Sequence, residues 1–198
     1  MPSPIGHAMA GIAVAWMADL VPGRRAWRTA PDAATWFARA GNGLTLVCAG
    51  LAASPDLDLL FQRHRTVTHS VGAVAAVGLV AALAAARGKW PIRRVSLMCG
   101  AAYATHLLLD WLCADYTPPY GLQMLWPFSN EWYISGWEVF RRTARLQVFT
   151  ASVIRINALA VAQEIAILLP LLAAVWLIRV KALAGLATEL ARRDHAPQ

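Results

Sequence analysis

Long apolar segments separated by short clusters of charged residues are the feature that most constrains this chain. Four of them approach the roughly 20 residues that an α-helix needs to cross a bilayer, and they cover residues 4–22, 70–86, 95–113 and 158–178. A fifth segment, residues 43–53, is too short to cross comfortably. Because 58% of the 198 residues are hydrophobic and only 15% are charged, the composition excludes an ordinary soluble domain. We therefore predict one all-α domain over residues 1–198, an integral membrane helical bundle with about four to five membrane-embedded helices.

The distribution of basic residues predicts an orientation for such a bundle. With five segments and the N-terminus outside, the inside loops hold 12 of the 18 Lys and Arg residues and the outside loops hold six. This bias agrees with the positive-inside rule of membrane proteins. The net charge of +7 forms no continuous basic stripe, because the basic residues stand between apolar segments. We therefore expect no nucleic-acid partner.

Four of the five histidines lie in short polar clusters at the margins of the apolar segments, and aspartates lie in two of these clusters. In the orientation above, all of these clusters fall on the outer side of the membrane. Imidazole and carboxylate are the groups that bind zinc and other divalent metals in proteins. The sequence thus predicts a divalent-metal site at the outer interface, with candidate ligands His7, Asp56, Asp58, His64, His69, His106 and Asp110.

The spacing of two pairs adds geometry to this prediction. His106 and Asp110 are four residues apart, so on a helix both side chains project from one face, about 6 Å apart at Cβ. Asp56 and Asp58 follow Pro55 in a predicted loop, where alternate residues of an extended segment point the same way. Two carboxylates held that close repel each other unless a cation neutralises them.

Most of these clusters also have a simpler interpretation when each is taken alone. One of the two aspartates after Pro55 can cap the turn there. His64 and Arg65 can contact lipid headgroups, and His7 can be an interfacial polar residue. The pair on the predicted helix near residue 106 is the exception, because ionisable groups inside a spanning helix are costly and usually mark function.

Residues 114–157 form the longest mixed stretch and are rich in aromatic residues and proline. We predict an interfacial aromatic loop, since amphipathic rings prefer the headgroup level, and this loop can also roof the site. Within it, residues 136–152 resemble a helix that lies on the membrane surface. Glu164, in the last apolar segment, demands a partner, for which an arginine such as Arg155 is one candidate.

The order and separation of four motifs resemble the YdjM-like family of inner-membrane, metal-dependent hydrolases. The resemblance covers roughly residues 5–130 and rests on Pro55-Asp56-Leu57-Asp58, His64-Arg65-x-x-Thr68-His69-Ser70, His106-Leu107-Leu108-Leu109-Asp110 and Gly121-x-x-x-Leu125-Trp126-Pro127-Phe128-Ser129. This family is distantly similar to the zinc-dependent phospholipase C and single-strand nuclease superfamily, which is all-helical and binds zinc through His and Asp. The resemblance implies that the seven candidate ligands named above surround the metal. Leu59 stands where many members have histidine, which leaves the number of ions open.

These inferences together predict an enzyme of the bacterial inner membrane, with several spans and a site on the periplasmic face. The expected reaction is hydrolysis of a phosphoester, in a lipid or a lipid-linked phosphate, by a metal-activated water. Zinc is the expected ion and manganese the second choice. We predict Asp58 as a general base and Arg65 as the group that stabilises charge on the phosphate.

The alternative is a protein without catalytic activity, either a metal-binding membrane scaffold or a transporter of ions or protons. A transporter is expected to place ionisable groups near the middle of the membrane and on both sides. The predicted ligands gather on one side instead, which favours the enzyme. Membrane lipid is a partner in either case.

Overall fold

The computed structural model describes residues 1–20, 41, 43–61 and 64–194, and no strand occurs among them. Two 3-10 helices, η2 (Ser54–Phe61) and η3 (Val67–His69), lie between the second and third of the α-helices in this part of the chain. The α-helices are α1 (Pro4–Met17), α3 (Gly43–Ala53), α4 (Val71–Arg87), α5 (Ile92–Trp111) and α6 (Ala151–Asp194). The prediction of an all-α fold is confirmed for the described residues.

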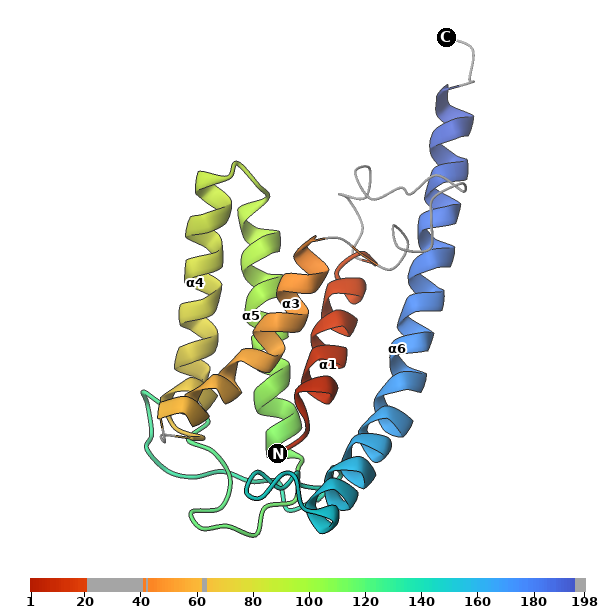
Figure 1. Ribbon diagram of the computed structural model, residues 1–198. Helices are drawn as coiled ribbons and strands as arrows, with labels where there is room; N and C mark the ends of the chain where they lie inside the picture. Colours follow the sequence, from red (N-terminus) through yellow and green to blue (C-terminus); the bar gives the residue numbers. More distant parts are fainter. Residues whose placement is uncertain (21–40, 42, 62–63, 195–198) are drawn as a thin grey trace.

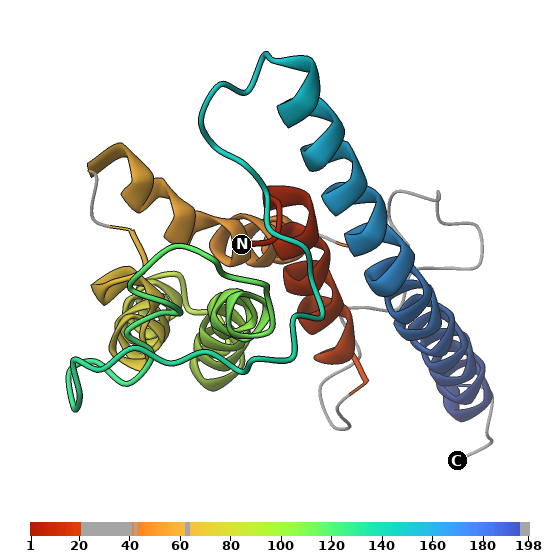
Figure 2. The same ribbon diagram turned by 90° about the horizontal axis from the view of Figure 1, so that it is seen from below.

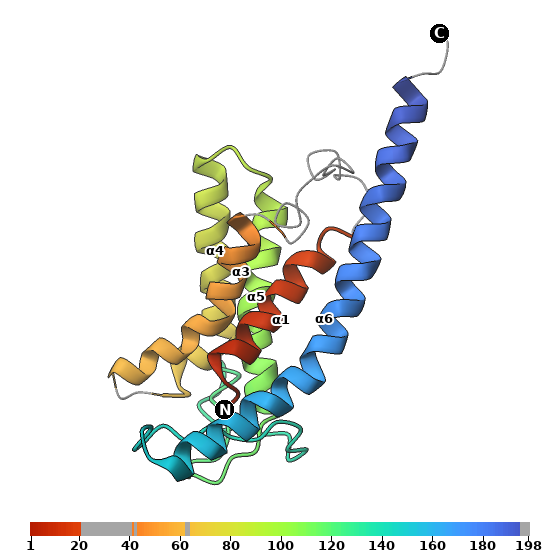
Figure 3. The same ribbon diagram turned by 45° about the vertical axis from the view of Figure 1, so that its right-hand side comes forward.

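The helices form a bundle in which α1, α3 and α5 lie between α4 on one flank and α6 on the other (Figure 1). α4 packs on α5, and α1 contacts α3, α5 and α6. The N-terminus, the segment 112–150 and the start of α6 all lie at one end of the bundle (Figures 1 and 3). Seen from that end, the segment 112–150 passes across the ends of α4, α5 and α1 (Figure 2). This end of the bundle carries the polar clusters.

Local sequence signals explain where the helices at this end begin. The side chain of Ser3 accepts a hydrogen bond from the amide of Gly6 at 3.3 Å, and Pro4 occupies the first helical position of α1. Ser70 does the same for α4, accepting from the amide of Ala73 at 3.1 Å. These caps fix the first turns of two helices directly beside the polar clusters.

Small residues let α1 and α3 approach each other closely. A Cβ added to Gly11 would lie 2.4 Å from the carbonyl oxygen of Cys48 and 2.8 Å from the Cβ of Ala52. Cys48, Ala52 and Ala15 are all buried in the same region. Close backbone approach through small residues is a common way for apolar helices to pack when no polar contact joins them.

A buried carboxylate joins three helices at the opposite end of the bundle. Asp19 accepts from Arg94 at 2.7 Å and from Arg179 at 2.8 Å. Arg94 also donates to the carbonyl of Ala18 at 3.1 Å. Because one carboxylate pairs with an arginine from each of two helices, α1, α5 and α6 are held in a fixed relation there.

The predicted number of membrane spans is not confirmed. Among the described residues, one stretch is long and apolar enough to cross a membrane, Ala151–Ala182 within α6. α1, α3 and α4 have 14, 11 and 17 residues, which at 1.5 Å per residue give about 21, 16 and 26 Å against the roughly 30 Å of a bilayer core. α5 has 20 residues, but it carries Arg93, Arg94, His106 and Asp110.

The predicted surface helix over residues 136–152 is wrong, because this stretch is irregular up to Thr150. Glu138 and Gln147 have positive φ angles of 48° and 53°, which a right-handed helix does not accommodate. Phe140 is buried against Leu109 and Cys113, so packing against α5 determines the path of this segment. The predicted loop thus extends to the start of α6.

The close contact between α1 and α3 gives a matched test of the fold. We expect Gly11→Ala to lower the free energy of unfolding by roughly 1–3 kcal/mol, because the added methyl group meets the Cys48 carbonyl. Gly50 is in α3 with no atom within 4 Å of its built Cβ, so Gly50→Ala should raise stability by up to about 1 kcal/mol. Denaturant unfolding of both variants in detergent would measure this. Equal shifts for the two variants would contradict the packing described.

Candidate metal centre

The structure brings all seven predicted ligands to the same end of the bundle, where the elements that carry them begin or end. One comes from the second turn of α1, two from η2, two from the segment that leads into α4, and two from the last turns of α5. They are, in that order, His7, Asp56, Asp58, His64, His69, His106 and Asp110. No single element supplies more than two, so the site exists only when the bundle is folded.

Five of the six distances among four side-chain atoms at the centre of this cluster are 3.1–3.7 Å, close to those expected around one metal ion. This four-atom group consists of His69 Nε2, His106 Nε2, Asp56 Oδ1 and Asp110 Oδ2. The two nitrogens are 3.1 Å apart, and each lies 3.7 Å from the Asp56 oxygen. The Asp110 oxygen lies 3.5 Å and 3.4 Å from the same nitrogens. Four donors at about 2.0–2.1 Å from a tetrahedral ion are about 3.3–3.4 Å from one another.

Hydrogen bonds behind the two imidazoles direct their lone pairs into the four-atom group. His106 Nδ1 lies 2.8 Å from the carbonyl oxygen of Ala52, which can only accept, so Nδ1 carries the proton. His69 Nδ1 faces Asp58 Oδ2 at 3.2 Å, and a carboxylate orients it in the same way. With a neutral His69, both Nε2 atoms would therefore present lone pairs to each other. Such an arrangement is unfavourable unless positive charge lies between them.

The cluster also contains buried polar atoms that lack a hydrogen-bond partner among the described residues. They are Asp56 Oδ1, both carboxylate oxygens of Asp110 and both ring nitrogens of His7. Buried polar atoms are normally paired, because leaving them unpaired costs free energy. A cation bound by these atoms would satisfy them.

The electrostatics of the cluster favour positive charge in the same place. Burial lowers the pKa of His69, but the adjacent carboxylates of Asp56 and Asp58 outweigh burial and raise it to about 9. The cluster thus retains a proton that a free imidazole would release near neutral pH. A metal ion would compete with this proton for the same carboxylates.

Asp58 lies behind His69 and outside the four-atom group. It accepts hydrogen bonds from His64 Nδ1 at 2.7 Å, from Thr68 Oγ1 at 2.6 Å and from the Arg65 amide at 3.3 Å. Burial raises the pKa of Asp58, yet its hydrogen bonds to His64, His69 and Thr68 outweigh burial and hold it below the ordinary range. The structure therefore places Asp58 where it orients His69.

The different directions of Asp56 and Asp58 have a simple structural cause. We predicted an extended segment after Pro55, but Ser54–Phe61 is a 3-10 helix, and that prediction is wrong. With three residues per turn, side chains two positions apart point to different sides. Asp56 consequently faces His69 Nε2 while Asp58 faces the Nδ1 of the same ring.

His7 and His64 flank the four-atom group on its two sides. The ring of His7 stacks on that of His106, with centroids 3.7 Å apart, and its Nε2 lies 3.5 Å from Asp110 Oδ1. Because Asp110 turns one oxygen to the four-atom group and the other to His7, it is placed to bridge two ions. His64 forms a second group with Asp56 and His69, whose ligand atoms lie within 4.8 Å of one another.

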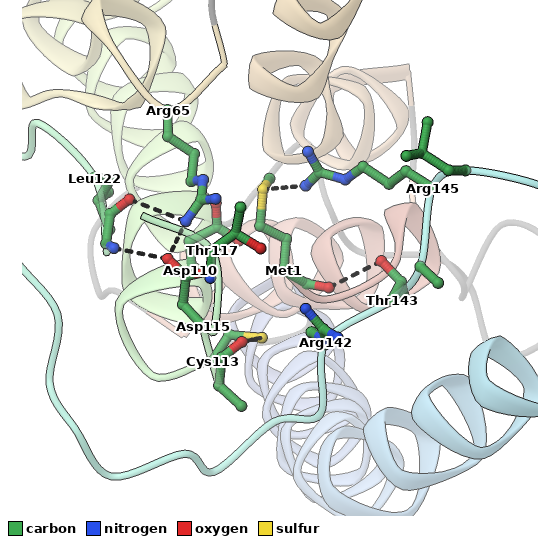
Figure 4. Close-up of a pocket in the computed structure, with 14 residues that line it drawn as sticks. Met1, Arg65, Asp110, Cys113, Asp115, Thr117, Leu122, Arg142, Thr143 and Arg145 are labelled. Atoms are coloured by element: carbon green, nitrogen blue, oxygen red, sulfur yellow. Dashed lines mark hydrogen bonds and ion pairs between the residues drawn. The ribbon is translucent and has the colours of Figure 1, made fainter. Parts of the chain in front are cut away.

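Arg65 lies beside a cavity of about 350 Å³ that borders this cluster and that Asp110 also lines. Its guanidinium group forms an ion pair with Asp115 and donates to the carbonyl of Gly121 at 3.3 Å (Figure 4). Burial raises the pKa of Asp115, but hydrogen bonds from the amides of Gly121 and Thr117 and the charge of Arg65 outweigh it and lower this pKa. Sequence reasoning missed Asp115, although a carboxylate five residues after Asp110 was a usable signal.

The aromatic loop is fixed against the site by backbone hydrogen bonds. The amide of Gln123 donates to the Arg65 carbonyl at 3.0 Å, and the amide of Gly72 donates to the Trp126 carbonyl at 3.0 Å. Position 72 also requires glycine, since a Cβ there would lie 2.8 Å from the Trp126 ring. The motif at residues 121–129 thus serves to hold the loop across the start of α4, where the predicted roof is found.

Glu164 pairs with Ser3 and not with Arg155, the arginine that the sequence suggested. It is fully buried and accepts from the amide of Ser3 at 2.8 Å and from the Ser3 hydroxyl. A Cβ on Gly6 would lie 2.6 Å from the carboxylate. The absence of a side chain at Gly6 therefore allows α6 to lie close to the first turn of α1. Glu164 therefore positions the turn that precedes His7.

The fold and this site define an all-helical protein in which imidazole and carboxylate groups converge as they do around divalent cations. The family model for the YdjM inner membrane protein matches residues 1–186, and the chain belongs to this family. No curated protein and no solved structure matches the chain. The family predicted from the motifs is confirmed, over more of the chain than the motifs cover. The distant link to the zinc-dependent phospholipase C and nuclease superfamily stays a prediction.

Two aspartates near the cavity provide a matched test of metal binding. Asp110→Asn removes a charged donor from the four-atom group, and we expect the affinity for zinc to fall at least about tenfold. Asp115→Asn removes the same charge from the partner of Arg65 and should leave zinc binding unchanged. Metal content after dialysis against a graded chelator series would measure both. Equal zinc retention by the two variants would show that Asp110 is no ligand.

Proposed function

We propose that this protein is a metal-dependent hydrolase of the inner membrane that cleaves a phosphoester. The observation that carries the proposal is the four-atom group, in which each imidazole nitrogen lies 3.1–3.7 Å from the other three atoms and which adjoins a cavity lined by Arg65 and Asp110. A divalent ion held there, zinc by preference and manganese as a second choice, would activate water and polarise a phosphoryl oxygen.

The residues around the cavity have separate parts in this proposal. His69, His106, Asp56 and Asp110 hold the ion. Asp58 is better suited to orienting His69 than to acting as a general base, because three hydrogen-bond donors occupy its carboxylate and lower its affinity for a proton. Arg65 stabilises negative charge on a phosphoryl group in the cavity, and Asp115 keeps its guanidinium group in place. His7 supplies a ring nitrogen for a second ion or for a proton.

The proposed location is a multi-pass arrangement with the site on the periplasmic face. Leu79, Val80 and Leu83 of α4 are 49–66% exposed, which supports contact between this helix and lipid. The basic residues around the turn between α4 and α5 lie at the end of the bundle opposite to the site (Figure 1). The positive-inside rule assigns that end to the cytoplasm.

A comparison of metal content and turnover separates this function from a metal-binding scaffold. Arg65→Ala should keep its zinc, because arginine does not bind cations, and should lose hydrolysis equivalent to about 2–4 kcal/mol of transition-state stabilisation. The assay is turnover of phosphomonoesters, phosphodiesters and phospholipids by the purified, zinc-loaded protein.

Three outcomes of this experiment have different meanings. Parallel loss of zinc and turnover in Arg65→Ala would place this residue in the metal site instead of the substrate site. A wild-type protein that holds zinc in a fixed ratio yet cleaves none of the panel would favour the scaffold. A wild-type protein without metal under replete conditions would exclude both.

A further inference from the structure

The cavity beside the metal cluster is lined by two arginines that have no part in the site described so far. Arg142 and Arg145 come from the irregular segment before α6, and Arg65 comes from the segment before α4. Arg65 and Arg145 point toward Met1 from opposite sides, and Arg142 lies below them (Figure 4). Three guanidinium groups from two distant parts of the chain therefore surround one space.

One of these three arginines has a carboxylate partner, and the other two contact uncharged groups. Arg65 is paired with Asp115. Arg142 lies over the ring of Tyr116 at 5.2 Å, and Arg145 contacts the thioether of Met1. Within the part of the chain that the structure describes, no ion pair joins Arg142 or Arg145 to a carboxylate. Since Asp110 on the cavity wall belongs to the metal cluster, the mouth of the cavity carries an excess of positive charge that attracts anions.

The chemistry of these side chains selects among anions. A guanidinium group presents several N–H donors in a planar fork, which matches the oxygens of a phosphate. Two such groups line the same cavity as Asp110 of the metal cluster, so a phosphate bound by them would lie in the space that borders this cluster. A neutral or positively charged ligand would leave the two arginines without counter-charge.

The surroundings of the cavity mouth indicate where this phosphate comes from. Leu146 and Phe149, one and four residues after Arg145, are 83% and 93% exposed. The candidate membrane span begins two residues later, at Ala151. Exposed large apolar side chains next to basic ones are typical of segments at the membrane interface, where anionic headgroups lie. The mouth of the cavity is therefore at headgroup level when α6 spans the membrane.

We propose that Arg142 and Arg145 bind the headgroup phosphate of an anionic membrane lipid and hold it in the cavity over the metal cluster. The binding site stands on the charge and placement of the two arginines. The further step, that the bound lipid is the substrate, rests on the proposed hydrolase function. The same phosphate chemistry is available in soluble phosphate esters, so the experiment compares both sources.

The test is binding of a fluorescent phosphatidic acid to the full-length, zinc-loaded protein in nanodiscs of phosphatidylcholine. The double variant Arg142→Gln and Arg145→Gln removes both proposed contacts. The control double variant Arg141→Gln and Arg155→Gln removes the same charge from neighbouring exposed positions that do not line the cavity. We expect affinity in the first variant to fall at least about tenfold further than in the control, with zinc content and melting temperature equal in all three proteins.

Each other outcome of the binding test has a definite meaning. Equal loss of affinity in the two double variants would overturn the site, because charge alone would then explain binding. If glycerol phosphate displaces the labelled lipid at an equal concentration, the proposal that the bound phosphate belongs to a lipid is wrong. A melting temperature that falls only in the first variant calls for the single variants Arg142→Lys and Arg145→Lys, which keep the charge but not the fork. If both lysine variants bind the lipid with wild-type affinity, recognition by the guanidinium groups is overturned.

Turnover separates this inference from the function on which its last step rests. Hydrolysis of phosphatidic acid that persists at the wild-type rate in the first double variant would overturn the step from bound lipid to substrate and leave the hydrolase intact. Wild-type protein that binds the labelled lipid through the two arginines, yet hydrolyses no phosphoester, would support the binding site and exclude the hydrolase.

Discussion

The convergence of two imidazole lone pairs and two carboxylate oxygens at one buried point is the interaction on which the rest of this structure depends. The contact of His69 Nδ1 with Asp58 and the hydrogen bond of His106 Nδ1 to the Ala52 carbonyl turn both Nε2 atoms toward each other at 3.1 Å, where two neutral rings would oppose their lone pairs. Only positive charge between them makes this arrangement favourable. The proton retained near His69 partly supplies it, and a divalent cation would supply it fully.

The bundle is built to hold these groups together. Caps at Ser3 and Ser70 begin α1 and α4 beside the cluster, Gly11 lets α3 approach α1, and Glu164 draws α6 to the same turn. Each ligand pair belongs to a different element, so a bound cation stabilises the contacts between helices as well as its own ligands. Folding and metal binding are therefore expected to be coupled in this protein.

Much of the site was predictable from the sequence, because helix ends place their polar residues together. The spacing of His106 and Asp110 on one helical face predicted their shared role, and the structure brings both to the cluster. The separate roles of Asp56 and Asp58 were not predictable, since they depend on a 3-10 helix that an alternating pattern does not indicate. Arg142 and Arg145 carry no motif and reach the cavity only through the irregular path of residues 136–150. The number of spans stays a prediction, because hydropathy does not reveal where short helices end.

X-ray absorption spectroscopy of the zinc-loaded protein in detergent tests the central claim most directly. The account predicts four nitrogen or oxygen ligands at about 2.0–2.1 Å, with the outer-shell scattering of two imidazoles and no sulfur. The same spectrum for a His106→Ala variant should lose the signal of one imidazole. A sulfur shell near 2.3 Å, a six-oxygen shell or a spectrum without imidazole scattering would contradict the account.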